Sequence, residues 1–461
     1  MDNLVFDTVL HGGMVMTPSG LVHTDVGIIN GRIAEIGDLK NTKTKNTIDC
    51  FGLHILPGVI DTQVHFREPG GEHKEDLHTG SLAAVAGGVT GVFEMPNTNP
   101  LTTTPETMVD KLKRASGRMY CDYAFYFGGT AENAHQLSEW ENLPGVCGIK
   151  IFMGASTGNL LVVEDEHIEN ILKNGRRVVA VHSEDEKMMN ENKARMLAEN
   201  PTPPVAMHNV WRSVEAAVNS TTRLMRIARK TGRRVHVLHI STAEELPILA
   251  AHRDVATCEV LPNHLTFAAP ECYERLGSLT QQNPPIREQY HQDALWHAVN
   301  TGLIDILGSD HAPHTLHEKE EPYPKSHSGT PGVQTMVPVM LNHINNGKMT
   351  LDRFVDMTAY GPARVHQIAN KGRIAPGYDA DFTIVDMNKQ MEITNAQQKS
   401  RAGWTPYDGM KVTGWPVMTI IRGRTVMRDD EILGEAAGKV IHFRETMEQN
   451  RTMSMPASNA A

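Results

Sequence analysis

The sequence of 461 residues lacks the features that mark several protein classes. No segment approaches the roughly 18 consecutive apolar residues of a membrane-spanning helix, so we expect no membrane partner. The five cysteines form no Cys-x-x-Cys pair, which argues against a disulfide framework or a cysteine zinc site and favours free thiols in a reducing compartment. The formal net charge of −10 argues against binding to nucleic acid. The first residues, Met1 to Leu4, are acidic rather than basic and precede no signal-peptide core, so we expect a cytoplasmic protein.

The composition is otherwise ordinary for an enzyme, with 40% hydrophobic and 21% charged residues. The chain is long enough for a large barrel and a smaller domain. Short alternating segments near the N-terminus, separated at Gly12-Gly13 and Asn30-Gly31, predict a small antiparallel sheet. Similar alternation over residues 373–440 predicts further strands. We expect residues 1–56 and 370–445 to combine into one small β-sandwich, and residues 446–461 to form a flexible tail.

Between these stretches, apolar strand-like runs alternate with helical stretches. The predicted strands are the run before Asp61, Gly91–Met95, Tyr123–Phe127, Gly148–Phe152, Val178–Val181, Val235–Ile240, Thr257–Val260 and Ile304–Ser309. The predicted helices include Glu75–Ala86, Thr104–Ala115, Val214–Lys230 and Ala243–His252. Eight strands that alternate with helices predict an α/β protein whose residues 57–369 form a (β/α)8 TIM barrel.

Residues able to bind a metal recur where the predicted barrel strands end. They are His65, Lys150, His182, His239 and Asp310. A single histidine at a strand end is more often structural or solvated than a ligand. Five such residues along one barrel are far more specific, because catalytic groups of these barrels lie at the C-terminal ends of the strands. Imidazole nitrogen and carboxylate oxygen suit Zn²⁺ with an open position for water, and a carboxylate beside that water can carry its proton.

The segment from Asp61 to Gly70 carries the most informative motif. Alternate residues of a strand share a face, so residues 63 and 65 point the same way. A His-x-His pair at this spacing at the end of a barrel strand is a metal-binding motif. This chain has His65, but Gln63 stands where the first histidine would be.

These segments resemble the cyclic amidohydrolases and, within them, the dihydroorotases. The resemblance extends over nearly the whole chain, and its most telling segments are His65-Phe66-Arg67-Glu68-Pro69-Gly70, Ala86-Gly87-Gly88-Val89-Thr90, Met95-Pro96-Asn97-Thr98-Asn99-Pro100, Lys150-Ile151-Phe152-Met153-Gly154, Asn283-Pro284-Pro285-Ile286-Arg287 and Ser309-Asp310-His311-Ala312-Pro313-His314. Hydantoinases and allantoinases share the scaffold but usually lack the arginine after the histidine pair and the Met-Pro-Asn-Thr run. The resemblance therefore implies a zinc-dependent enzyme that interconverts dihydroorotate and N-carbamoyl-aspartate in pyrimidine synthesis.

The resemblance also implies a ligand set for zinc. His65 and Asp310 would bind the more buried metal, and His182 and His239 the second. Lys150 would bridge them if its amine is carboxylated, since an ammonium cannot coordinate a metal whereas a carbamate presents two anionic oxygens. Without the resemblance, Lys150 would be an exposed lysine at a strand end or would pair with a carboxylate. Asp310 would in addition be the catalytic acid and base.

The substrate-binding residues implied by the resemblance are Arg67, Asn97, Asn283 and His314. Arginine suits the free carboxylate of the substrate because its planar fork matches a carboxylate through two hydrogen bonds. Asn283 resembles the residue that bonds the ring amide. Without the resemblance, Arg67 would pair with Glu68 or Glu75, and the two asparagines would be ordinary loop residues.

Gln63 leaves three outcomes open, because a neutral amide oxygen is a poor zinc ligand beside imidazole. The enzyme runs on one zinc held by His182 and His239, with or without Lys150, it keeps two with Gln63 or water filling the gap, or catalysis is lost and the chain serves as a scaffold. The other predicted site residues are all in place, which favours activity. A hydantoinase or allantoinase activity is the alternative enzymatic interpretation.

Two further expectations concern the surroundings of the site. The polar segment from Thr315 to Gly332 is either a lid over the site or a solvated loop. The resemblance also implies a homo-oligomer, a dimer or a tetramer, which acts on a small-molecule substrate.

Overall fold

The computed structural model describes residues 5–155 and 160–446. The tail expected over residues 446–461 lies outside the described residues, apart from Thr446. Among the described helices, none combines the length and the apolar character needed to cross a membrane.

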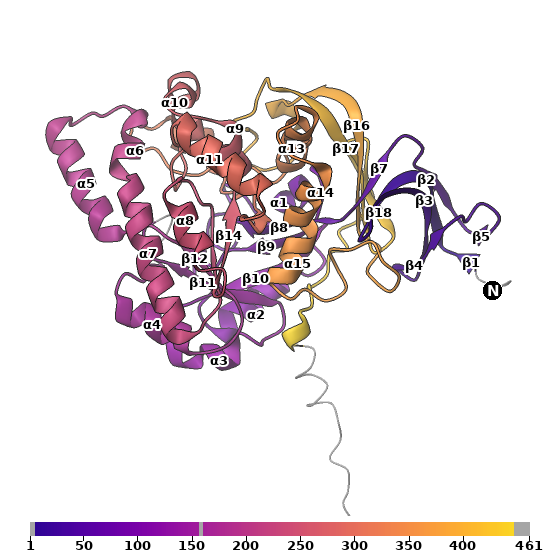
Figure 1. Ribbon diagram of the computed structural model, residues 1–461, viewed down its shortest axis with the longest axis horizontal. Coiled ribbons are helices and arrows are strands. Elements are labelled where there is room, and N and C mark those ends of the chain that lie inside the picture. Colours follow the sequence, from indigo (N-terminus) through magenta and orange to yellow (C-terminus); the bar gives the residue numbers. More distant parts are fainter. Residues whose placement is uncertain (1–4, 156–159, 447–461) are drawn as a thin grey trace, which may run out of the picture.

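Eight parallel strands form the centre of the molecule (Figure 1). In chain order they are β8 (Val59–Val64), β9 (Val89–Glu94), β10 (Asp122–Gly128), β11 (Val146–Phe152), β12 (Val179–His182), β13 (Val235–Val237), β14 (Ala256–Val260) and β15 (Ile306–Leu307), and each pairs with the next. The chain beyond β15 returns to β8 through a parallel bridge between Val64 and His311, where the His65 amide donates to the His311 carbonyl over 2.7 Å. The expected (β/α)8 barrel is confirmed.

Helices lie around these strands (Figure 1). They are α1 (Leu77–Ala86), α2 (Pro105–Ala115), α3 (Leu137–Trp140), α4 (Asp165–Lys173), α5 (Glu186–Glu199), α6 (His208–Trp211), α7 (Val214–Thr231), α8 (Glu245–Ala250), α9 (Pro262–Thr266), α10 (Glu271–Leu276), α11 (Gln289–Asn300), α12 (Leu316–Glu320), α13 (Met336–Asn345), α14 (Leu351–Val355) and α15 (Gly361–Val365). The long α7 shows why such segments are helical. The Ser213 side chain accepts from the Ala216 amide at its start, Gly232 ends it at a φ of 68°, and apolar residues such as Leu224 and Ala228 are buried at helical spacing.

Strands from both ends of the chain combine into a second, nine-stranded sheet. They are β2 (Thr8–Thr17), β3 (Gly20–Ile29), β4 (Arg32–Gly37), β6 (Thr47–Asp49) and β7 (His54–Pro57) from the first part, and β16 (Phe382–Glu392), β17 (Lys411–Ile421), β18 (Arg424–Arg428) and β19 (Glu431–Ile432) from the last, while β1 (Val5–Phe6) pairs only with β5 (Lys43–Thr44). The two parts meet where β7 pairs antiparallel with β16. In Figure 1 the indigo and yellow strands accordingly lie side by side. The expected sandwich made from both ends of the chain is confirmed.

Two details of the predicted N-terminal sheet are wrong. Gly12-Gly13 is not a turn between strands, because it lies inside β2 where the register against β3 shifts between Leu10 and Gly13. This makes it a bulge, in which one strand carries extra residues and bends. In addition, β2 runs parallel to β6 and β7, so the sheet is mixed rather than antiparallel. The Asn30-Gly31 turn between β3 and β4 stands as predicted.

The segment after β19 closes one end of the barrel. The Tyr123 amide donates to the Lys439 carbonyl over 3.0 Å, and the Ile441 amide donates to the Tyr123 carbonyl over 2.8 Å. Since β10 begins at Asp122, these bonds lie at the end where the barrel strands start. Ile441 and Phe443 belong to a buried cluster with residues of six barrel strands or their ends, and they are 1% and 2% exposed. This segment therefore completes the core of the barrel on the side away from the strand ends that carry the predicted site.

Candidate active site

The predicted site residues gather where the barrel strands end. Gln63 lies in β8 and His65 follows it, Lys150 lies in β11, His182 ends β12, and His239 and Asp310 lie in the loops just beyond β13 and β15. The strands predicted at Val235–Ile240 and Ile304–Ser309 are shorter in the structure. They end at Val237 and Leu307, so His239 and Asp310 lie in the loops that follow.

Three of the predicted site residues have a backbone conformation that residues other than glycine rarely adopt. The φ angles are 62° at Arg67, 40° at His239 and 45° at Asp310. Each such residue costs roughly 1–3 kcal/mol, and such residues concentrate at active sites where the surroundings fix them. This strain supports a functional role for the end of the barrel at which all three lie.

His182 and His239 form a pair suited to a metal ion. His182 Nδ1 and His239 Nε2 lie 3.0 Å apart, roughly the separation of two nitrogens that bind one Zn²⁺ at about 2.0 Å. His182 Nε2 lies 2.8 Å from Glu184 Oε2, and this acceptor keeps the proton on Nε2 and the lone pair on Nδ1. Burial lowers the pKa of both imidazoles, so both are neutral at pH 7.

Glu184 is held as a carboxylate in this buried position. Burial alone would raise its pKa, but the Arg212 guanidinium, together with the hydrogen bond from His182, brings it to about 2. Arg212 Nη1 donates to Glu184 Oε2, and its Nη2 donates to the Ala155 carbonyl. A chain of contacts therefore runs from Arg212 through Glu184 to the metal-competent histidine pair.

Lys150 is neither exposed nor paired with a carboxylate, the two alternatives open from the sequence. It is 1% exposed, its Nζ lies 4.4 Å from the centre of the Phe152 ring, and no carboxylate of the described residues lies within ion-pair distance of it. Burial lowers its pKa to about 7. Beside the larger effect of burial, its charge contributes to lowering the pKa of His65, His182 and His239.

His65 and Asp310 lie together, but Gln63 bonds to the same carboxylate. His65 Nε2 lies 3.2 Å from Asp310 Oδ1, and Gln63 Nε2 donates to that oxygen over 2.9 Å. On its other side, His65 Nδ1 lies 2.9 Å from Asn97 Oδ1. The place that the resemblance assigns to a buried metal is thus occupied by direct contacts between side chains.

Arg67 is a buried cation without a carboxylate partner among the described residues. It is 8% exposed, its Nε donates to the Pro313 carbonyl over 3.2 Å, and its Nη2 lies 3.3 Å from His314 Nε2. Burial lowers its pKa to about 10. The salt bridges with Glu68 or Glu75 that the sequence left open do not form, since Glu68 pairs with Arg118 instead.

Arg67 lines a pocket of about 440 Å³ together with Lys74, Asn97 and the backbone of the 69–71 turn, and the lining contains no carboxylate. Lys74 Nζ lies 3.1 Å from His314 Nδ1, so a second cation stands beside the predicted carboxylate site. The Lys74 ammonium is already paired with Glu318 over 2.8 Å, whereas the Arg67 guanidinium has no carboxylate partner among the described residues and favours an anionic ligand in this partly buried pocket.

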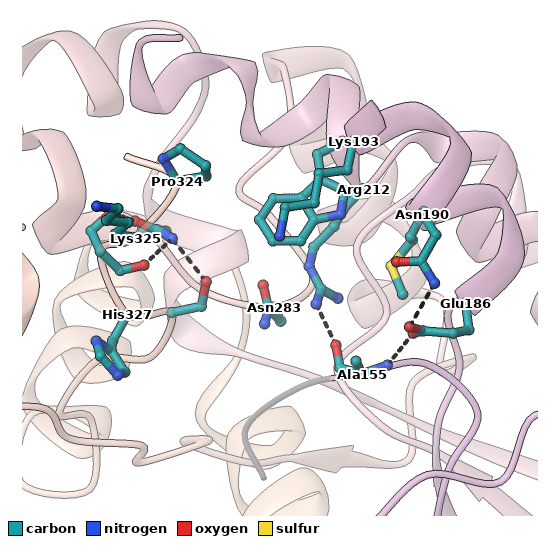
Figure 2. A pocket seen from close by; sticks show the side chains of 14 residues that line it. Ala155, Glu186, Asn190, Lys193, Arg212, Asn283, Pro324, Lys325 and His327 are labelled. Atoms are coloured by element: carbon teal, nitrogen blue, oxygen red, sulfur yellow. Dashed lines mark hydrogen bonds between the residues drawn. The ribbon is translucent and has the colours of Figure 1, made fainter. Parts of the chain in front are cut away.

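Asn283 lies on the other side of the site, in a pocket of about 320 Å³ with Trp211 and Arg212 (Figure 2). Figure 2 shows Arg212 pointing past Asn283 toward the Ala155 carbonyl. His208 Nε2 donates to Asn283 Oδ1 over 2.9 Å, and burial keeps this histidine neutral by lowering its pKa to about 3. The bond orients the amide so that its Nδ2 faces the pocket as a donor.

The segment from Thr315 to Gly332 is fastened to the barrel by buried hydrogen bonds. Lys319 is fully buried, and its Nζ donates to the carbonyls of Gln281, His327 and Gly329 at 2.9, 2.7 and 2.9 Å. The side chain of Gln281 also donates to the Ser326 carbonyl over 2.9 Å. In this conformation the segment is a fixed wall of the pocket that contains Asn283, and not a lid standing open.

Within the described residues, one group of three metal-capable side chains is compact enough for an ion, and it is formed by His314, Glu318 and His327. Lys74 Nζ lies 2.8 Å from Glu318 and 3.1 Å from His314. The ammonium of Lys74 beside this group opposes a second cation, so we assign no metal ion to these three residues.

Sequence reasoning missed three residues of this arrangement: Lys74, Glu184 and His208. Glu184 stands two residues after His182, the same spacing as in the His-x-His motif, and that spacing was the available signal. Lys74 and His208 reach the site through contacts with residues 240 and 75 positions away, and nothing in their local sequence indicates this.

Comparison with known proteins gives concordant results. A model of the amidohydrolase family matches residues 54–426. The chain is 35% identical over 423 residues to a dihydroorotase of Pyrococcus abyssi, which covers 91% of this chain and 95% of that protein. It is 33% identical over 428 residues to a dihydroorotase of Methanosarcina mazei, which covers 90% of this chain and 92% of that protein.

Solved structures show the same architecture. An L-hydantoinase from Arthrobacter aurescens superposes with a TM-score of 0.91 at 28% identity, covering 95% of this chain and all of that one. A dihydropyrimidinase from Brevibacillus agri NCHU1002 superposes with a TM-score of 0.86 at 26% identity, covering 94% of this chain and 97% of that one.

Proposed function

Since the chain belongs to the amidohydrolase family, we propose that it is a dihydroorotase, which interconverts dihydroorotate and N-carbamoyl-aspartate by reversible hydrolysis of a cyclic amide. The reaction belongs to the de novo synthesis of pyrimidines, and we place the enzyme in the cytoplasm. Its partner is the small-molecule substrate.

The observation that carries this proposal is the unpaired, buried guanidinium of Arg67. A hydantoin ring offers no fixed anion to such a group, whereas dihydroorotate carries a free carboxylate on its ring. Arg67, with Asn97, His314 and Lys74 around the same pocket, would bind that carboxylate. Asn283, oriented by His208, would donate to the ring amide.

The donor set of the site fits zinc. His182 and His239 would hold it through the two nitrogens that lie 3.0 Å apart, with Lys150 as a carbamate, and His65 with Asp310 are the remaining ligands of the predicted set. The buried amine of Lys150, which has no ion-paired carboxylate among the described residues, is suited to react with carbon dioxide. When bound, Zn²⁺ supplies an activated water and polarises the ring carbonyl, and the predicted content is one or two ions per chain.

Asp310 would carry the proton of the reaction. Its carboxylate would accept the proton of the attacking water and return it to the ring nitrogen that leaves. Gln63 and His65 hold Oδ1 of this carboxylate from two sides, so its position relative to the ring is fixed before the substrate binds.

We also propose a division of the chain and an assembly. Residues 57–369 form the barrel domain and residues 1–56 with 370–445 the sandwich domain, and the enzyme forms a homodimer or homotetramer. The nine-stranded sheet that joins both ends of the chain supports the division. Light scattering of the purified protein gives the assembly, and a monomeric mass would exclude it.

The function is tested by assaying dihydroorotate, hydantoin and allantoin side by side. We expect turnover of dihydroorotate, and a fall of at least about 100-fold in kcat/KM for Arg67→Ala on this substrate, since a lost charged hydrogen-bond pair costs about 3 kcal/mol. Arg67→Lys keeps the charge but not the fork and should retain intermediate activity. If Arg67→Ala lowered kcat/KM equally for all three substrates, Arg67 would not be the residue that binds the substrate carboxylate.

The similarity to an L-hydantoinase supports hydantoin hydrolysis as the second candidate, and preferential turnover of hydantoin would establish it. A scaffold without catalysis is the third interpretation. Zinc bound in stoichiometric amount together with turnover of dihydroorotate would exclude it, whereas neither zinc nor turnover would exclude the enzyme.

A further inference from the structure

Gln63 is a buried amide in contact with Asp310, the proposed acid and base. It is 1% exposed, and its Nε2 donates to Asp310 Oδ1 over 2.9 Å. The nitrogen, rather than the oxygen, faces the carboxylate because a carboxylate can only accept. An amide N–H cannot be a metal ligand, and the neutral oxygen of this amide, buried without a hydrogen-bond partner among the described residues, is a poor ligand for zinc beside imidazole.

A hydrogen bond from its backbone amide holds Gln63 in position. The buried carboxylate of Asp61 accepts the amide of Gln63 and the amide of Ser309, each over 3.1 Å. Ser309 directly precedes Asp310, so one side chain sets the separation between Gln63 and Asp310. The contact between them is therefore built into the junction at which β8 meets the chain after β15.

Apart from Lys150, the predicted zinc ligands form two pairs, His65 with Asp310 and His182 with His239. The side-chain contacts of their ligand atoms differ between the two pairs. Asp310 Oδ1 is in contact with Gln63 Nε2 and His65 Nε2, and His65 Nδ1 is in contact with Asn97. Within the part of the chain that the structure describes, the buried Nδ1 of His239 has no hydrogen-bond partner, and its Nε2 is in contact with Nδ1 of His182, the other proposed ligand of the same ion. Zinc sites use three or more protein ligands. The carbamate proposed for Lys150 would give the His182 and His239 pair its third ligand, whereas Gln63 leaves His65 and Asp310 without a third ligand of their own.

We propose that Gln63 replaces a metal ligand by a hydrogen-bond donor. The chain then binds one zinc at the His182 and His239 pair, and Gln63 is the positioning residue that holds Asp310 for proton transfer in place of a second ion. This inference rests on the proposed function for the identity of the reaction, but the metal content that it specifies can be measured without it.

The first experiment counts zinc per chain by mass spectrometry of the metal in purified wild type and Gln63→His. We expect one zinc in the wild type and two in the variant, because an imidazole at residue 63 completes three ligands with His65 and Asp310. Two zinc ions in the wild type, or one in both proteins, would overturn the inference.

The second experiment separates positioning from a structural role. Gln63→Met keeps the volume but removes the donor, and we expect kcat to fall roughly 10- to 100-fold with KM changed less than about 2-fold and one zinc retained. Gln292→Met is the matched control, because Gln292 is also buried and donates to the Phe267 carbonyl over 2.8 Å, in α11. It should leave kcat unchanged.

An unchanged kcat in Gln63→Met, or an equal loss in both variants, would overturn the positioning role. The outcome is separable from that of the proposed function. If the wild type hydrolyses hydantoin rather than dihydroorotate, the zinc count and the kcat ratio still decide the role of Gln63.

Discussion

Glu184 determines which of the two ring nitrogens of His182 carries the proton. With Arg212 holding its charge, the carboxylate accepts from His182 Nε2 and leaves Nδ1 bare toward His239. At the scale of single residues, Glu184 and Arg212 thus shape the site without being proposed to touch the substrate. They decide which nitrogen of His182 has a lone pair available for a metal ion.

Replacement of this carboxylate should weaken metal binding. We expect Glu184→Gln to lower zinc affinity roughly 10- to 100-fold, because a neutral amide orients the imidazole less firmly and leaves Arg212 without its partner charge. Competition with a chromophoric chelator measures the affinity. Glu141→Gln is the control, since Glu141 is a buried carboxylate paired with Arg233 over 2.6 Å elsewhere in the barrel. Equal affinities of both variants would contradict the role of Glu184.

At the scale of elements, one lysine holds the wall of the Asn283 pocket. The ammonium of Lys319, at the end of α12, donates to three carbonyls, two of which belong to the segment that follows this helix. A buried cation is tolerated where its donors are satisfied in this way. The part of the segment that follows α12 is therefore held by contacts of the side chains of Lys319 and Gln281 rather than by a helix or a strand.

Removal of this ammonium should free the segment. In Lys319→Met the carbonyls of His327 and Gly329 lose the ammonium donor, and the Gln281 carbonyl keeps only the Gly329 amide, so we expect a loss of stability on the order of 3 kcal/mol with faster amide exchange over residues 315–330. Hydrogen exchange followed by mass spectrometry measures this. Lys325→Met changes an exposed lysine of the same segment and should leave exchange unchanged. Unaltered protection in Lys319→Met would show that the segment is held by other contacts.

The sequence allowed the barrel strands to be predicted because buried parallel strands are continuous apolar runs. Their ends were less predictable, since the turns that carry His239 and Asp310 at positive φ follow from tertiary contacts. For the same reason the metal-capable histidines could be predicted from their places at strand ends. The contact between Lys74 and His314 spans 240 residues and has no local pattern.

At the scale of the whole molecule, the barrel is completed by residues from the far end of the chain. Phe443 lies in the buried cluster of the barrel, 5.7 Å from the Phe93 ring and with the Arg177 guanidinium 4.5 Å from its centre. The segment around it bonds to the start of β10. The stability of the catalytic barrel therefore depends on a segment that follows the sandwich in sequence.

Truncation of this side chain should destabilise the whole barrel. We expect Phe443→Ala to reduce the free energy of unfolding by about 3–5 kcal/mol, the cost of a cavity at a buried phenylalanine. Urea unfolding followed by far-ultraviolet circular dichroism measures it. Phe51→Ala is the control, since Phe51 is 79% exposed and should change stability by less than about 0.5 kcal/mol. A loss below 1 kcal/mol for Phe443→Ala would show that the barrel core is complete without this segment.

The pairing of β7 with β16 has a consequence for biosynthesis. Directly after β7, the Val59 amide donates to Thr383 Oγ1, a partner 324 residues later in the chain. At translation rates of about 5–20 residues per second, the first strands of the sheet leave the ribosome tens of seconds before their partners exist. Throughout that interval the edge of β7 that pairs with β16 is unpaired, so the nascent chain is most exposed to aggregation before residue 382 is synthesised.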